Sequence, residues 1–182
     1  MNFILFCKTK EEYGFLSNFS KHPIMFDDKK YQTSEALFQT FKFNDDNEDT
    51  KEYKEFIRIT DSPGKCACLG RQKKHRFGSK WKIQKSGDIL INDVIEKYKE
   101  NVKLRKDWNE VRVEIMKKVI HLKFDQNPDL KEKLLKTPSN TIFVEHTKRD
   151  KFWGDGGDKG DGKIGMNMLG KIITEYINEN RK

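Results

Sequence analysis

The feature that most constrains the fold is a long amphipathic run from Trp108 to Phe124. Apolar residues recur along this run at intervals of three and four, which is the spacing of one helical face. That face holds Val111, Ile115, Val119 and Leu122, and a second set, Val113, Met116, Ile120 and Phe124, widens it. We therefore expect a helix over 108–124 that is apolar on two adjacent sides and lies centrally in a core.

Shorter elements are expected on either side of this helix. Apolar runs at 3–6 and 141–145 predict buried strands, and residues 23–31 predict a hairpin that leads into a helix capped by Thr33 or Ser34. Further helices are expected over 51–59, from 63 toward 70, within 89–98, after Pro128, and from 167 to about 178. The tally predicts a mainly helical α+β fold, formed as a single domain over 1–182 with an insertion within 72–103.

The amino-acid composition indicates an ordered chain, and the net charge favours one class of partner. Charged residues make up 36% of the chain and hydrophobic residues 35%, but 13 Phe, 5 Tyr and 3 Trp argue against a disordered chain. The net charge of +8 favours an anionic partner, such as a phosphate-bearing metabolite or a nucleic acid. Surface lysines also keep proteins soluble, so the positive charge alone does not decide between an anionic partner and a role in solubility.

The cysteines and histidines predict no metal site and no disulfide framework. Three cysteines and no recognisable signal peptide favour a reduced, intracellular and hence cytoplasmic protein. The four histidines lack metal-ligand spacing, and no apolar run is long enough to span a membrane. We expect no cofactor, and the sequence does not predict an oligomeric state.

The stretch from Tyr31 to Lys42 carries the main candidate for a site. On a helix, Glu35, Gln39 and Lys42 fall at i, i+4 and i+7 and share one stripe. A carboxylate, an amide and an amine are thus aligned beside the aromatic ring of Phe38. The same pattern is also typical of a solvated polar face on an amphipathic helix. The stripe alone does not decide between a functional site and such a face.

A second candidate region lies near the C-terminus, where Glu145 to Gly154 follow a predicted strand. Strand ends and their loops are common places for functional groups. The glycine-rich loop 155–162 comes next and leads to a helix at 165–167, an arrangement that can bind phosphate. The loop matches neither an EF-hand nor a P-loop, and a flexible surface loop is an equal alternative.

Seven segments taken together resemble the NADAR family of YbiA-like N-glycosidases. They occur in the family order and cover nearly the whole chain: 14–19, 31–42, 62–71, 104–108, 123–128, 145–154 and 165–170. The resemblance implies a compact, mainly helical α+β domain that cleaves an N-glycosidic bond. It also implies phosphoribosyl substrates of the riboflavin-precursor type, or ADP-ribose attached to guanine.

The resemblance assigns roles to individual residues. Glu35 is the general acid/base, Lys42 acts through an imine with the ring-opened ribose or electrostatically, and Asp150 orients the ribose or serves as a second acid. These roles fit a reaction in which positive charge builds on the sugar while the base leaves. The substrate-binding residues implied are Asn18, Phe19, Gln39, Arg71, Trp108, Glu145, Trp153, Gly154 and Asn167.

Two other classes of function compete with the N-glycosidase. A non-catalytic module that binds ADP-ribose or nucleotides would keep the aromatic residues and glycines without needing Glu35 and Lys42. A nucleic-acid-binding protein would use the +8 charge, although no recognised motif of that class is present. An enzyme acting on ADP-ribosylated DNA would combine both properties. The segment between Arg71 and Leu104 looks longer than in compact members of the family, so the substrate stays open.

Overall fold

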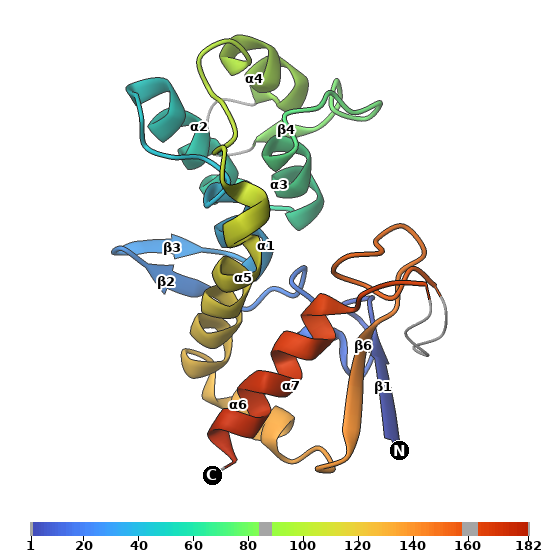
Figure 1. Ribbon diagram of the computed structural model, residues 1–182. Coiled ribbons are helices and arrows are strands. Elements are labelled where there is room, and N and C mark those ends of the chain that lie inside the picture. Colours follow the sequence, from blue (N-terminus) through green and yellow to red (C-terminus); the bar gives the residue numbers. More distant parts are fainter. Residues whose placement is uncertain (1, 84–88, 158–163, 182) are drawn as a thin grey trace. The chain divides into compact units, whose positions relative to one another are not determined.

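The computed structural model describes residues 2–83, 89–157 and 164–181. The chain forms two compact units (Figure 1). Unit 1 comprises residues 1–22 and 116–182, and unit 2 comprises residues 23–115. The helix α5 (Trp108–Asp125) begins in the sequence of unit 2 and ends in that of unit 1.

Unit 1 is built on two parallel strands, β1 (Asn2–Phe6) and β6 (Thr141–Glu145). The strands lie side by side in Figure 1, with Asn2 opposite Thr141 and Phe6 opposite Glu145. The helix α7 (Met168–Asn180) packs on β6. Contact is close at Gly170, where an added Cβ would lie 2.0 Å from the carbonyl oxygen of Phe143. The remaining elements are the short 3-10 helix η1 (Gly14–Leu16), the end of α5, and α6 (Pro128–Leu135).

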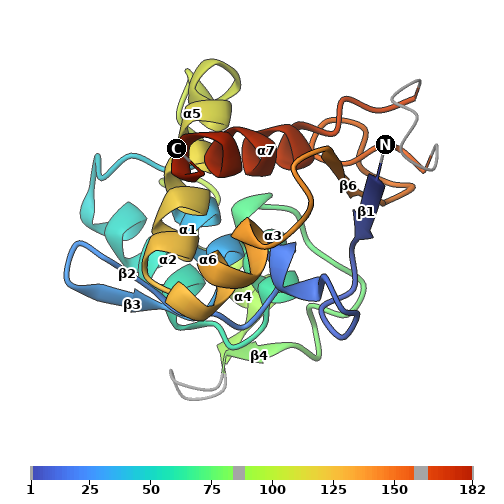
Figure 2. The ribbon, with the colours of Figure 1, turned by 90° about the horizontal axis from the view of Figure 1, so that it is seen from below.

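Unit 2 opens with a hairpin of β2 (Ile24–Phe26) and β3 (Lys29–Tyr31), which run side by side in both views (Figure 1 and Figure 2). Its two turn residues have φ of 52° and 55°, the left-handed geometry that suits a tight hairpin. The helices are α1 (Ser34–Thr40), α2 (Glu48–Ile59), α3 (Pro63–Gly70) and α4 (Ile91–Tyr98). Two short strands, β4 (Lys82–Ile83) and β5 (Ile89–Leu90), precede α4.

Aromatic residues form the centre of the core of unit 2. Tyr53 is fully buried and meets the rings of Phe43 and Tyr98 edge-on, at centroid distances of 5.3 and 5.8 Å. Its hydroxyl donates to the carbonyl of Leu69 at 2.8 Å, so the one buried polar atom of the ring is satisfied. This contact ties α2 to α3 and fixes the framework that holds α1.

The mainly helical α+β fold predicted from the sequence is confirmed. Among the described residues there are seven α-helices and six strands of two to five residues. The expected strand at 3–6 exists but is only half buried, because Phe3 and Leu5 remain 49% and 43% exposed. The helix expected over 89–98 starts later, since its first two residues form β5.

Some predictions are not decided by this structure. The insertion within 72–103 includes residues 84–88, and the glycine-rich loop includes residues 158–163; both stretches lie outside the described residues. The single domain over 1–182 likewise stays a prediction. No helix in the part of the chain that the structure describes combines the length and apolar character needed to cross a membrane.

Candidate functional site

The helix α1 places the predicted catalytic stripe in unit 2. Thr33 caps the helix, because its hydroxyl accepts a hydrogen bond from the N–H of Ala36 at 3.1 Å. Glu35 and Gln39, one turn apart, are buried at 7% and 5% exposure. The Gln39 amide donates to the Glu35 carboxylate, with 2.7 Å between Nε2 and Oε1. A solvated polar face is therefore excluded for these two residues.

Gln39 occupies its position because α3 approaches α1 at a glycine. A Cβ added to Gly70 would lie 1.8 Å from Gln39 Oε1, so any larger residue would displace the amide. The Oε1 atom is buried and finds no hydrogen-bond donor among the described residues. Buried polar atoms are nearly always paired, which makes this oxygen a natural acceptor for a group on a ligand.

Lys42 lies just beyond the end of α1 rather than on the helix. Its backbone N–H donates to Gln39 at 3.3 Å in a turn, and its carbonyl accepts from the N–H of Arg105 at 2.9 Å. The ammonium nitrogen lies 5.5 Å from the ring centroid of Trp108 and 6.0 Å from that of Phe38. The two rings are themselves in contact, with centroids 5.1 Å apart. The Lys42 amine thus lies beside two aromatic rings.

Burial lowers the pKa of the Lys42 amine. The Glu35 carboxylate acts in the opposite direction and raises this pKa, while the positive charge of Arg71 lowers it further. Since burial is the largest of the three effects, the net direction is downward. The amine therefore loses its proton more readily than an exposed lysine, although a carboxylate lies nearby.

Arg105 and Asp107 fix the position of Lys42 and Trp108. The Arg105 guanidinium forms a bidentate pair with the Asp107 carboxylate, at 2.6 and 2.8 Å. The backbone of Arg105 holds Lys42, and Trp108 directly follows Asp107 at the start of α5. The segment 104–108 thus holds Lys42 in position.

In unit 1 the structure brings together most of the second predicted set. The loop after β6 folds back on itself, because the N–H of Asp155 donates to Glu145 O at 3.0 Å. One oxygen of Asp150 accepts from the N–H groups of Phe152 and Trp153, at 2.9 and 2.8 Å. Gly154 is required by this packing, since a Cβ there would lie 2.4 Å from the side chain of Thr147.

Asn167 joins this loop to α7. Its backbone has φ of 47°, and its N–H donates to Gly154 O at 3.0 Å. Its amide oxygen accepts from the N–H of Glu145 at 3.0 Å, and its amide nitrogen donates to Phe143 O at 2.7 Å. Both ends of the side chain therefore bind the backbone around β6. A direct role in substrate binding stays a prediction, whereas the structural role is plain.

Asn18 and Phe19 follow η1, also in unit 1. Asn18 is buried and donates to the sulfur of Met116 at 3.2 Å, while its Oδ1 has no donor among the described residues. Phe19 is 40% exposed. Each unit thus holds one predicted binding residue with a buried, unpaired amide oxygen.

Known proteins resemble this chain over the sequence that carries these residues. The family model described as NADAR domain matches residues 5–107 and 102–179. The chain belongs to the NADAR domain family. Within that family, the N-glycosidase YbiA of Escherichia coli (strain K12) is 35% identical over 172 residues, which are 94% of this chain and 84% of the relative. The NADAR chain is accordingly a hydrolase that acts on N-glycosyl compounds.

Two further matches support this membership. The NMR structure of the E. coli protein YbiA matches the NADAR chain with a TM-score of 0.69 and 34% identity, covering 98% of this chain and 84% of that one. The riboflavin biosynthesis protein PYRR, chloroplastic, of Zea mays is 30% identical over 184 residues. That match covers 98% of this chain but only 25% of the maize protein.

Two buried groups in unit 1 of the NADAR chain escaped the sequence analysis. Lys123 is fully buried, and its amine donates to Ser17 O and to Ser20 Oγ at 2.9 Å each. Burial lowers the pKa of this amine to about 7. Lys123 lies in one of the family segments, but a lysine in an amphipathic helix gives no local signal that it is buried.

The second group is the Asp155 carboxylate, which is fully buried. It lies 2.6 Å from His146 Nδ1 and accepts from the N–H groups of Thr147 and Gly157, at 3.0 and 2.8 Å. These contacts order the start of the glycine-rich loop. The sequence signal was an acid between two glycines, which was read only as part of a flexible or phosphate-binding loop.

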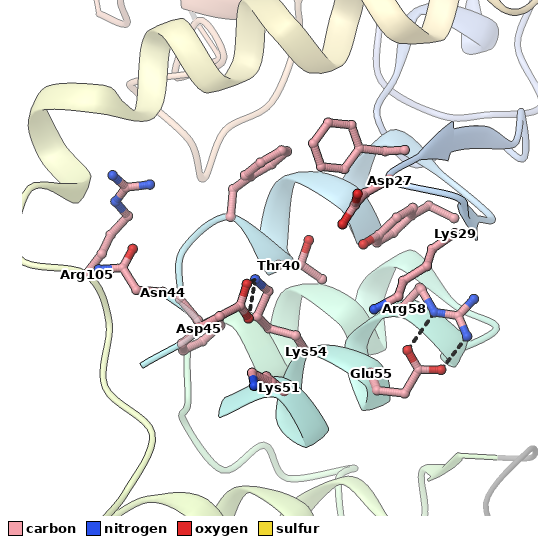
Figure 3. A pocket seen from close by; sticks show the side chains of 14 residues that line it. Asp27, Lys29, Thr40, Asn44, Asp45, Lys51, Lys54, Glu55, Arg58 and Arg105 are labelled. Atoms are coloured by element: carbon pink, nitrogen blue, oxygen red, sulfur yellow. Dashed lines mark hydrogen bonds and ion pairs between the residues drawn. The ribbon is translucent and has the colours of Figure 1, made fainter. Parts of the chain in front are cut away.

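A cavity of about 520 Å³ also lies in unit 2 (Figure 3). Thr40 and Phe41 contribute to its wall, but Glu35, Gln39 and Lys42 do not line it. Two of the ion pairs at its wall, Lys54 with Asp45 at 2.8 Å and Arg58 with Glu55, are marked by dashed lines in Figure 3. Its lining also includes Arg105, whose backbone holds Lys42, so the cavity adjoins the candidate site without being lined by its three polar groups.

Within residues 2–83, 89–157 and 164–181, no three His, Cys, Asp or Glu side chains gather to hold a metal ion. The groups available for chemistry in unit 2 are the Glu35 carboxylate, the Gln39 amide and the Lys42 amine.

Proposed function

We propose that this chain hydrolyses the N-glycosidic bond between a base and a ribose, where the ribose belongs either to a ribose phosphate or to an ADP-ribosyl group. The observation that carries the proposal is the buried Glu35–Gln39 pair, together with a Lys42 amine whose pKa is lowered by burial. The name of one relative, N-glycosidase, supports the reaction class, and the name of the other, riboflavin biosynthesis protein, makes a compound of that pathway a candidate substrate.

The proposed reaction begins with attack of the neutral Lys42 amine on C1 of the ribose. The bond between C1 and the base nitrogen breaks, and Glu35 delivers a proton to the leaving base. The Glu35 carboxylate then takes up one of the two amine protons. The other amine proton passes to the ring oxygen as the bond between C1 and that oxygen breaks, which gives an imine with an opened sugar. Water then adds to the imine carbon, which releases the sugar aldehyde and restores the amine.

The remaining groups of unit 2 prepare this step. Phe38 and Trp108 lie beside the Lys42 amine, and burial of this side chain lowers the pKa of the amine, which favours its neutral form. Gln39 donates to Glu35 and offers its unpaired oxygen to a hydroxyl of the sugar or an N–H of the base. The role predicted for Asp150, to orient the ribose or serve as a second acid, stays a prediction. The substrate-binding roles predicted for Trp153 and Asn18 also stay predictions, to be checked by the same assay.

The decisive experiment measures turnover of two substrates: a DNA oligonucleotide carrying ADP-ribose on guanine, and a ribosylaminopyrimidine phosphate. Wild type is compared with Glu35→Gln, Lys42→Ala and a control, Lys29→Ala, which removes an exposed lysine of the same unit. We expect at least a hundredfold loss of kcat in the first two variants and no change in the control. Borohydride added during turnover should attach the sugar to Lys42, detected by mass spectrometry.

The outcomes separate the alternatives. Release of ADP-ribose from DNA identifies a glycohydrolase of modified DNA, and cleavage of the small molecule alone identifies a metabolite-clearing enzyme. Full rates in both folded variants would refute the catalytic assignment. Binding of ADP-ribose by wild type without turnover of either substrate would favour the non-catalytic binding module.

A further inference from the structure

Residues 72–83 of unit 2, here called the basic arm, concentrate positive charge. These residues include five lysines or arginines and no aspartate or glutamate, in a chain whose total net charge is only +8. All five are exposed: Lys73, Lys74, Arg76, Lys80 and Lys82. The basic arm follows α3 and leads into β4, in the green part of the ribbon (Figure 1).

Three aromatic rings stand among these charges. The rings of His75 and Trp81 are stacked, with centroids 4.8 Å apart and planes inclined by 13°. Phe77 lies beside them, 6.1 Å from Trp81, and is 45% exposed. The Arg76 guanidinium lies 4.5 Å from the centroid of Phe77. Large rings left exposed beside cations are costly for a surface that serves only solubility.

The turn that carries the rings is held in place by α4. The Asn92 side chain accepts from the N–H of His75 at 3.1 Å and donates to the carbonyl of His75 at 3.2 Å. Gly78 lets Asn92 approach, since a Cβ at this glycine would lie 2.0 Å from Asn92 Oδ1. The N–H of Trp81 donates to Phe77 O at 3.0 Å. The ring cluster is therefore preorganised.

Most of the positive charge of the basic arm is available to a partner. Lys74 pairs with Glu96 of α4 at 2.8 Å, and Glu96 also binds Lys99. Arg76, Lys73 and Lys80 form no ion pair with an acidic side chain of the described residues. A polyanion that approaches this surface would thus meet three cations that have no acidic partner among the described residues, beside an exposed ring.

We infer that the basic arm docks single-stranded nucleic acid. Phosphates would contact Lys73, Arg76 and Lys80, while an unpaired base would stack on Phe77 beside the His75–Trp81 pair. A duplex offers its phosphates but hides its base faces, and a simple polyanion has no such faces. This inference goes beyond the proposed function and does not rest on it, because binding requires neither Glu35 nor Lys42.

The test uses fluorescence anisotropy with a labelled oligothymidylate and an abasic oligonucleotide of equal length, which has the same phosphates but no bases. Arg76→Glu/Lys80→Glu is compared with the control Lys10→Glu/Lys133→Glu, which makes the same change of net charge at two exposed lysines of unit 1. We expect the first pair to weaken binding of both probes at least tenfold. The control pair should change the affinity for both probes less than about threefold, because salt screens distant charges.

Phe77→Ala separates stacking from charge. We expect it to weaken oligothymidylate binding by about fivefold to a hundredfold and to leave abasic binding unchanged. Equal weakening by the control pair would overturn the inference, as would equal affinity of wild type for the two probes. Tighter binding of a duplex than of the single strand would also refute it. A thermal melt by circular dichroism checks that each variant is folded; Phe77 is exposed, so its removal should not unfold the chain.

Discussion

At the residue scale, the balance of charges around Lys42 leads to a prediction about pH. The positive charge of Arg71 lowers the pKa of the Lys42 amine, so Arg71→Gln should raise this pKa. If the neutral amine is the reacting form, kcat/KM increases as Lys42 deprotonates. In Arg71→Gln the increase of kcat/KM should occur at higher pH than in wild type, even if the substitution also changes the absolute value of kcat/KM.

The measurement is the pH profile of kcat/KM for wild type and Arg71→Gln. Arg58→Gln is the matched control, since Arg58 belongs to the same unit but is paired with Glu55 and is not among the groups that shift Lys42. A shift to lower pH in Arg71→Gln would contradict the neutral-amine mechanism.

Lys123 makes a second prediction at this scale, concerning stability. Its pKa is about 7 in the folded chain against an ordinary value of 10.5. Below pH 7 the lysine is charged in both states. Between pH 7 and 10.5 only the unfolded chain holds the proton, so the free energy of unfolding rises with pH, by at most about 1.4 kcal/mol per unit.

The comparison with Lys123→Met isolates this effect above pH 7, because His22, which the Lys123 charge also affects, titrates outside this range. Burial, and secondly the Lys123 charge, lowers the pKa of His22 below its ordinary value of 6.5. We expect the stability of wild type relative to Lys123→Met to increase from pH 7 to pH 10, measured by urea unfolding. A difference that stays constant over this range would show that Lys123 keeps its ordinary pKa.

At the element scale, the approach of α3 to α1 depends on one glycine. In Gly70→Ala the new Cβ would occupy the place of Gln39 Oε1, only 1.8 Å away. The side chain of Gln39 must move, and its hydrogen bond to Glu35 is lost. We expect a loss of up to about 100-fold in kcat, as a displaced catalytic contact produces, and a destabilisation of about 1–3 kcal/mol.

Gly64→Ala provides the control within the same helix. Its Cβ would meet Ser62 Oγ at 3.8 Å, an ordinary contact, so kcat should be unchanged. Comparable kcat values for the two variants would show that the position of Gln39 does not matter for catalysis.

The same scale shows why some elements were predicted and others were not. Helix periodicity is local, so α5 was predicted at 108–124 and is found at Trp108–Asp125. The parallel pairing of β1 with β6 joins residues about 140 positions apart, and no local pattern reveals it. The exposure of Phe3 and Leu5 follows from that two-stranded sheet, since only one face is covered.

At the scale of the whole molecule, the site could be predicted only in part for a similar reason. The spacing of Glu35 and Gln39 identified a real buried pair, because one helix holds both. The roles of Gly70 and Arg105 depend on contacts between distant segments, and those of Asp155 and Lys123 depend on burial. Pattern analysis treats lysine and aspartate as surface residues, so it cannot find the exceptions.

The last prediction concerns cooperativity between the two units. The helix α5 is continuous and has residues in both, and the two segments of unit 1 are connected only through unit 2. A helix forms and melts cooperatively along its length, so unfolding either unit should remove part of the helix needed by the other. We therefore expect the whole chain to unfold in one transition, as predicted for a single domain.

Two buried side chains test this expectation, Ile57 in unit 2 and Leu134 in unit 1, both with 0% exposure. Ile57→Ala and Leu134→Ala should each cost about 2–5 kcal/mol and lower the midpoint of the same transition. Hydrogen exchange in increasing urea, followed by mass spectrometry of peptides from each unit, reports the two parts separately. If each substitution accelerated exchange only in its own unit, the units would be independent domains, and α5 would not transmit stability between them.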